Sequence, residues 1–188
     1  EHAATYEVAG LPEGFTAEVT LTNDKLTDVG SDTAAVAGIV IKKGESVVTD
    51  QFANIDTTST AAIAITPVAI EITAASASKQ YDGEALTKNA WKITDGELVG
   101  TDAIEVTVTG SQTEVGSSKN VASAAVVKNG NTDVTGNYTF SYVPGTLTVT
   151  QSEAAIVVTV TGFEETYDGE EHAATYEVAG LPEGFTAE

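Results

Sequence analysis

The sequence contains no cysteine, no arginine and no methionine, and each absence excludes something. Without cysteine there is no disulfide framework, no thiolate metal site and no cysteine nucleophile. All 8 cationic side chains are lysines, against 28 acidic residues, and the formal net charge is −20. This charge disfavours binding to nucleic acid or to an anionic membrane, because phosphate groups must be met by cations. The lack of methionine predicts an excised or processed piece of a longer protein.

Long hydrophobic runs and proline-rich stretches are also missing. No run approaches the roughly 20 apolar residues that a membrane span needs, and 4 prolines are too few for a proline-rich linker. Apolar side chains still make up 41% of the chain, many of them Val, Ile and Ala set among Thr, which is enough to build cores. The composition therefore predicts a soluble, acidic, globular protein, and the missing Cys and Arg favour the outside of a bacterial cell.

The chain repeats itself. Residues 1–18 and 171–188 are identical, both reading EHAATYEVAGLPEGFTAE, which sets a period of 170 residues. A weaker repeat divides that period, because Tyr81-Asp82-Gly83 aligns with Tyr167-Asp168-Gly169 at an offset of 86. We therefore expect two diverged modules in each period.

These repeats predict three segments. Residues 1–68 form module A, which lacks its first strand, and residues 69–151 form a complete module B. Residues 155–188, here called the opening segment, are the beginning of the next module A. If the chain is free, the edge left open in module A predicts head-to-tail assembly by strand complementation.

Alternating apolar and polar residues predict that both modules are mainly β. Ile104, Val106 and Val108 alternate with polar neighbours, as in a strand with one buried face. The same alternation occurs at 19–22, 63–65, 70–72, 147–149 and 156–160. Continuous apolar runs at 35–41 and 121–127 predict central strands that are covered on both faces. Short helical turns are expected only within 45–51 and 131–137.

A string of short motifs in module B carries a family resemblance. Tyr81 to Thr87 (YDGEALT) is followed by Val115-Gly116, then Asn137-Tyr138-Thr139, then Pro144 to Val149 (PGTLTV). This order resembles the MBG/YDG-type repeat domain of bacterial cell-surface adhesins. The resemblance implies small β-grasp-like modules in tandem, arranged as an elongated rod, and an immunoglobulin-like sandwich is the alternative fold. It also implies a stalk or spacer and supplies no catalytic residues.

Candidate site residues are few. His2 and His172 are one repeat position counted twice, so neither a triad nor a histidine metal site is predicted, and we do not expect an enzyme. A sugar could contact aromatic rings, and calcium is the natural cation for so acidic a chain. The ligand-binding candidates are Tyr81, Tyr167 and Trp91, and the calcium candidates are Asp82, Asp168, Glu71, Glu153 and Asp102. Lys119 or Lys128 with Asn137 is a candidate isopeptide pair.

The sequence thus favours a structural protein of the bacterial cell surface. Its expected partners are neighbouring repeats of the same protein, joined head to tail. No cofactor is expected, and calcium is the one candidate cation. The alternative is an adhesive module that binds host glycan or mucin. Neither nucleic acid nor direct membrane insertion is expected.

Overall fold

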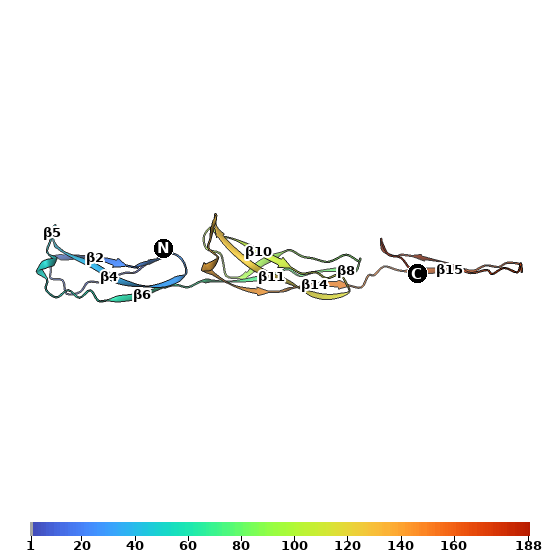
Figure 1. The fold of residues 1–188 in the computed structure, drawn as a ribbon, viewed down its shortest axis with the longest axis horizontal. Helices are drawn as coiled ribbons and strands as arrows, with labels where there is room; N and C mark the ends of the chain where they lie inside the picture. Colours follow the sequence, from blue (N-terminus) through green and yellow to red (C-terminus); the bar gives the residue numbers. More distant parts are fainter. Residues whose placement is uncertain (1) are drawn as a thin grey trace. The chain divides into compact units, whose positions relative to one another are not determined.

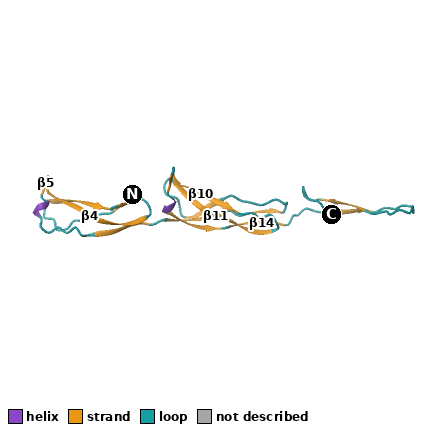
Figure 2. Cartoon of the chain, in the orientation of Figure 1, coloured by secondary structure: helices purple, strands orange, loops and turns teal. Residues whose placement is uncertain are grey.

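A computed structural model describes residues 2–188 (Figure 1). Strands make up 52% of the chain, and the helical elements within the described residues are two single-turn 3₁₀ helices, so the predicted mainly β class is confirmed (Figure 2). By its internal contacts the chain divides into two compact units. Unit 1 holds the chain up to Glu71, Thr94–Glu105 and Ala125–Ser141, and unit 2 holds Ile72–Ile93, Val106–Ala124 and the chain from Tyr142 onward.

Module A, which lies in unit 1, is built on one long strand. That strand, β4 (Gly30–Lys43), pairs with β2 over its second half and with β6 over its first half, both antiparallel. The other elements of module A are β1 (His2–Ala3), β2 (Phe15–Thr22), β3 (Lys25–Leu26), β5 (Ser46–Val47), η1 (Thr49–Gln51) and β6 (Thr60–Ile65). Strand β5 pairs with the end of β4, and β1 pairs with β3.

Module B contains two sheets. One has the order β13-β7-β9, and the other has the order β10-β11-β14-β8, with β12 paired to β11. Strands β8 and β14 are parallel, with Ala77 opposite Leu147 and Gln80 opposite Thr150. The elements are β7 (Val68–Ala74), β8 (Ala77–Gln80), β9 (Trp91–Asp95), β10 (Ala103–Thr109), β11 (Gly116–Asn129), β12 (Thr132–Asp133), η2 (Thr135–Asn137), β13 (Tyr138–Val143) and β14 (Gly145–Thr150).

The opening segment contains one antiparallel hairpin. Strand β15 (Val157–Thr161) pairs with β16 (Thr175–Ala179), so that Val157 lies opposite Ala179 and Thr161 opposite Thr175. Every residue of β15 is exposed, although the strand is rich in valine.

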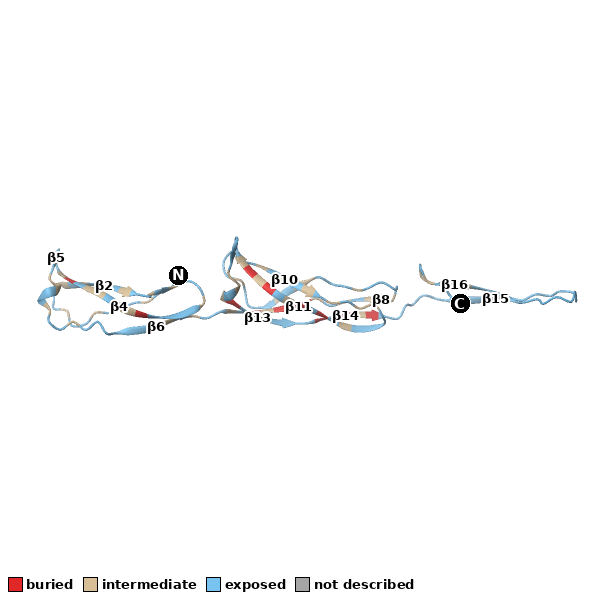
Figure 3. Cartoon of the chain, viewed as in Figure 1, coloured by how far each residue is buried: buried red, intermediate tan, exposed pale blue. Residues whose placement is uncertain are grey.

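The core of module B is dense, and that of module A is thin (Figure 3). In module B the side chains of Ile70, Ile72, Val127, Leu147 and Val149 are at most 1% exposed. In module A only Ala34 and Ile41 count as buried apolar residues among those described. The same chain therefore carries a well-covered module beside an under-covered one.

The continuous apolar runs are central strands, but the expectation that both faces are covered was wrong. Val40 and Val121 are 37% and 41% exposed. In β4 the pairing with β2 shifts register between Thr20 and Leu21, which is a β-bulge. In β11, Ala124 has φ of 51°, and buried positions change from even numbers (120, 122) to odd numbers (125, 127). When the buried face changes from even-numbered to odd-numbered residues partway along a strand, apolar residues occur at both kinds of position. A strand with only one buried face then has a continuous apolar run in its sequence.

The short turns predicted within 45–51 and 131–137 are present as η1 and η2, and they are built alike. The backbone N–H of Ile41 donates to Thr49 Oγ1 at 2.8 Å, and that of Val127 donates to Thr135 Oγ1 at 2.9 Å. Within each pair, the donor and the acceptor are 8 residues apart. The second pair lies 86 residues after the first, as Thr135 does after Thr49. The structure of the two modules therefore repeats at the offset seen in the sequence.

Candidate functional site

The 18 repeated residues have identical sequences and different structures. Thr175–Ala179 forms β16 beside β15, whereas the same sequence at residues 5–9 is not a strand. Conversely, Phe15–Thr22 forms β2 beside β4, whereas residues 185–188 are not a strand. In each copy the strand forms only where its pairing partner is present, because tertiary context decides β structure more than local propensity does.

The repeated phenylalanine also changes its neighbour. Phe15 packs edge-on against Phe52, with ring centroids 5.6 Å apart, inside module A. Phe185 packs instead against Tyr81, at 5.8 Å, inside unit 2. Phe185 therefore lacks the module A neighbours that its copy has.

An open groove runs through module A. Residues 4–11 form one wall and residues 52–61 contribute to the other, around a volume of about 650 Å³. The floor is apolar and is formed by Val19, Leu21, Ala34, Val36, Ile39 and Ile41. A groove lined by the inner faces of β2 and β4 is the place where further core residues would lie.

In module B the corresponding place is filled by a strand. There β7 lies between β13 and β9, and its residues Ile70, Ile72 and Ala74 are at most 1% exposed. At the 86-residue offset, β7 corresponds to residues 154–160, which include most of β15. Ile156, Val158 and Val160 in this segment are 56%, 59% and 66% exposed. Residues 154–160 thus correspond in sequence to a buried strand of module B, and Ile156, Val158 and Val160 among them are exposed.

The two Tyr-Asp-Gly motifs have the same local geometry, an Asx turn at the aspartate. Asp82 Oδ1 accepts the N–H of Glu84, and Asp168 Oδ1 accepts that of Glu170, each at 2.9 Å. Both glycines have φ of 84°, in the left-handed region that glycine favours. Tyr81 is half-buried, whereas Tyr167 is 95% exposed.

The aspartates of these turns are engaged by their own neighbours. The pKa of Asp82 is lowered, first by the hydrogen bond from Lys79 and then by the N–H of Glu84. The pKa of Asp168 is lowered, first by the N–H of Glu170 and then by His172, whose Nε2 lies 3.0 Å from the carboxylate. Their local role is therefore to stabilise the turn.

The remaining calcium candidates are dispersed. Glu71 Oε1 accepts the hydroxyl of Thr94 at 2.8 Å, Asp102 contacts Tyr138 and Asn129, and Glu153 is exposed in the segment after β14. No three His, Cys, Asp or Glu side chains converge as metal ligands within residues 2–188.

Tyr138 anchors a buried network that sequence reasoning missed. Its hydroxyl donates to Asp102 Oδ2 at 2.6 Å and accepts the N–H of Val99 at 2.9 Å, and the residue is 6% exposed. Burial, and then the bond to Asp102, raise the pKa of Tyr138, while hydrogen bonds from Tyr138 and then Asn129 lower the pKa of Asp102. Tyr138 is thus part of the core, as its position on an alternating strand indicates, and Trp91 is half-buried on β9.

Asn120 is a second residue that the sequence did not single out. It is 0% exposed, and its Nδ2 donates to the carbonyl oxygens of Ala75 and Lys88, both at 2.8 Å. Its Oδ1 has no partner among the described residues. The corresponding position in module A is Ala34, so the amide belongs to module B alone. A lone Asn just before the apolar run at 121–127 was the available signal.

Asn137 joins the two modules within unit 1. Its Nδ2 donates to Asp28 Oδ1, and its Oδ1 accepts the N–H of Val29, both at 2.7 Å. Both amide atoms are thus engaged by the turn before β4. Lys128 Nζ lies 3.5 Å from Glu105 Oε2, and an isopeptide link of Asn137 with Lys119 or Lys128 stays a prediction.

No family model, curated protein or solved structure matches the chain. Within residues 2–188, no helix has the length and apolar character that crossing a bilayer demands.

Proposed function

We propose that this chain is a structural tandem-repeat segment of a bacterial surface adhesin or extracellular filament, acting as a stalk or spacer built from β-grasp-like modules. The observation that carries the proposal is the recurrence of one architecture at an 86-residue offset inside an exact sequence period of 170 residues. Repeats of this kind add length without new chemistry, because each repeat contacts mainly its neighbours.

The contact between modules supports a spacer. A flexible linker would leave the two modules free, whereas Asn137 binds the Asp28–Val29 turn through two hydrogen bonds. The net charge of −20 also keeps such an array soluble and repels it from an anionic cell surface.

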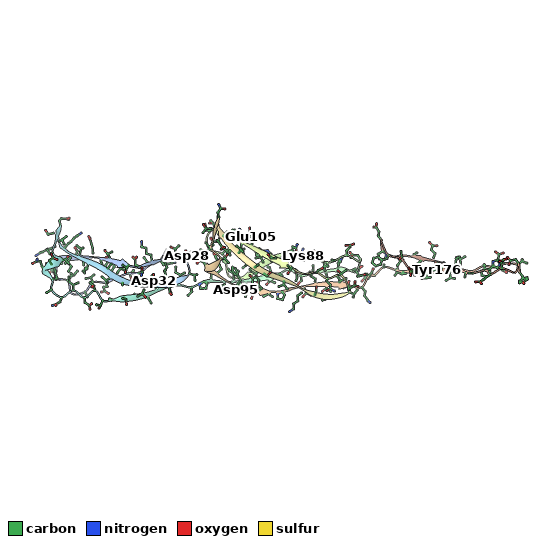
Figure 4. The ribbon with its side chains drawn as sticks, viewed as in Figure 1. Asp28, Asp32, Lys88, Asp95, Glu105 and Tyr176 are labelled. Carbon is green, nitrogen blue, oxygen red and sulfur yellow. The ribbon has the colours of Figure 1, made fainter. Side chains whose placement is uncertain are left out.

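Binding of host glycan or mucin is the second candidate, favoured by exposed aromatic rings in the opening segment. Tyr167 is 95% exposed and Tyr176, on β16, is 61% exposed (Figure 4). Aromatic faces are common sugar contacts, although an incomplete module exposes the same rings.

Small-angle scattering of chains with one, two and three 170-residue periods tests the spacer role. We expect the maximum dimension to grow by a constant increment for each period added. A dimension that stays constant would contradict the proposal. A glycan array probed with the same chains tests the alternative, and saturable binding abolished by Tyr167→Ala would favour adhesion over spacing.

A further inference from the structure

We propose that Gln51 of module A binds the Glu114–Val115 turn of the module B that precedes it in the repeat array. This contact repeats the one that Asn137 makes with the Asp28–Val29 turn, here called the junction contact. The proposal rests on the proposed tandem-repeat function, because the two partners then belong to consecutive periods of one chain. Every junction between modules is closed in the same way, by an amide side chain bound to an acidic turn.

The junction contact recognises two groups at once. The Nδ2 of Asn137 donates to the carboxylate of Asp28, and its Oδ1 accepts the backbone N–H of Val29, both at 2.7 Å. A carboxamide holds its donor and its acceptor in one plane. Its partner must therefore present an acceptor side chain directly followed by an available backbone N–H.

The same chemistry recurs at the 86-residue offset. Gln51 stands where Asn137 stands in the other module, and Glu114–Val115 stands where Asp28–Val29 stands. Glutamine keeps the carboxamide and glutamate keeps the carboxylate. Both sides of the contact thus keep the groups that form the two hydrogen bonds.

The two acidic turns lead into strands that pair alike. The strand after the first turn starts at Gly30, which lies opposite Ile65 in β6. The strand after the second turn starts at Gly116, which lies opposite Val149 in β14. Strands β6 and β14 are the last strands of their modules, so each turn lies at the end from which the chain leaves its module.

The exposure of the four groups separates the contact that is made from the one that is proposed. Asn137 and Val29, which are bonded to each other, are both half-buried. Their counterparts are uncovered, because Gln51 is exposed and Val115 is 51% exposed. Gln51 and the Glu114–Val115 turn are therefore accessible to partners outside the described residues.

The lengths of the side chains match the lengths of the junctions. From residue 65 to residue 70 the chain passes from module A to module B in 5 steps, whereas the equivalent passage from 149 to 156 takes 7. The junction after module B is thus the longer one. Gln51 and Glu114 each have one methylene more than their counterparts, so the pair reaches across a wider separation.

Hydrogen exchange at Val115 tests the contact in a chain made of residues 1–170 followed by residues 1–188. In that chain a module A follows the first Val115 but not the second, so the molecule contains its own reference. With one period labelled isotopically by segmental ligation, we expect the first Val115 amide to exchange about 10-fold more slowly, because it is hydrogen-bonded. Equal exchange at the two amides would overturn the proposal.

Replacing Gln51 in one period at a time separates a direct contact from an effect on folding. Gln51→Ala in the second period removes the carboxamide that faces the first Val115, so the two Val115 amides should then exchange alike. Gln51→Ala in the first period is the matched control and should leave their difference in place. Equal effects of the two substitutions would contradict a direct contact.

Exchanging the acid and the amide tests their complementarity. Glu114→Gln in the first period replaces a charged acceptor by a neutral one, and Gln51→Glu in the second brings two carboxylates together, so each alone should speed exchange at the first Val115. The double variant restores one amide and one carboxylate and should recover most of the protection. A double variant no better protected than the single ones would refute the pairing. If Val115 is unprotected while the maximum dimension still grows with each period, the Gln51 contact falls and the spacer function stands.

Discussion

At the scale of single residues, the buried Asn120 donates to two backbone carbonyl groups at once. Asn120→Ala leaves the carbonyl oxygens of Ala75 and Lys88 without a donor, so we expect module B to lose about 1–3 kcal/mol of unfolding free energy. Urea unfolding followed by the fluorescence of Trp91, the single tryptophan, measures this loss. Asn89→Ala removes an exposed amide nearby and should change stability by less than about 0.5 kcal/mol. Equal effects of the two variants would refute this role for Asn120.

The Asp102–Tyr138 pair makes stability depend on pH at both extremes. The pKa of Asp102 is lowered from 3.8, so its contribution is present above that value and is lost as pH falls through the lower folded pKa. The pKa of Tyr138 is raised from 10.0, so its contribution is present below that value and is lost as pH rises through the higher folded pKa.

Tyr138→Phe should therefore flatten the alkaline side of the pH–stability curve and reduce the acid side. Urea midpoints measured from pH 3 to pH 11, a range of about one unit beyond the two ordinary values, check this expectation. Glu105→Gln, at an exposed acid of the neighbouring strand, is the control and should leave both limbs in place. A Tyr138→Phe curve that is parallel to the parent curve would rule out the linkage.

Which residues could be predicted depended on the range of their interactions. Burial of Leu147 and Val149 follows from alternation, which is local. The partners of Asn120 lie 45 and 32 residues away, and Asp102 lies 36 residues from Tyr138. A single sequence indicates that such residues are polar but does not indicate which distant backbone they meet, so both networks were missed.

At the scale of elements, Gly96 allows β9 to end close to β7. It has φ of 78°, and an added Cβ would overlap the carbonyl oxygen of Ala69. Gly180 has φ of 85° and the same close approach to Ala155, so the feature recurs in the opening segment. A side chain at this position is strained both by the backbone conformation and by the contact.

Gly96→Ala should accordingly cost about 1–3 kcal/mol of unfolding free energy. Gly136→Ala is the matched control, because Gly136 lies in η2 with open space around it and no positive φ. Trp91, on the same strand as the turn, reports the unfolding midpoint in urea. Equal urea midpoints for Gly96→Ala and Gly136→Ala would show that module B does not require glycine at position 96.

Strand positions were accessible from the sequence, whereas strand pairing was not. Every alternating segment that predicted a strand contains one, and η1 and η2 lie within the predicted turns. The parallel pairing of β8 with β14 joins residues 70 apart and leaves no local pattern. The sequence also did not predict the β-bulge, because a strand whose buried face changes partway has the same continuous apolar run as a strand buried on both faces.

At the scale of the whole molecule, Asn137 of module B bonds the turn before β4 of module A, within unit 1. Asn137→Ala removes two hydrogen bonds to the Asp28–Val29 turn, one of them to a carboxylate, so we expect that turn to open more often. The amide of Val29 should exchange about 10-fold faster or more, given about 1.4 kcal/mol lost for each factor of ten.

Gln51 occupies the corresponding position in η1 and is exposed, so Gln51→Ala is the control. Hydrogen exchange at the Val29 amide should be unchanged in that variant. Acceleration confined to Asn137→Ala identifies the amide as the tie between modules, and equal exchange in all three chains would exclude it.

The parallel pairing of β8 with β14 bears on how a module would carry load. The chain enters module B through β7 and β8 and leaves it directly after β14. If a module is pulled by its two ends, parallel terminal strands slide along each other, and the pairs from Ala77–Leu147 to Gln80–Thr150 bear the force together. In an antiparallel terminal pair, the same pull would break the backbone hydrogen bonds one after another. In the proposed stalk, these pairs would bear together any tension applied through the two ends of a module.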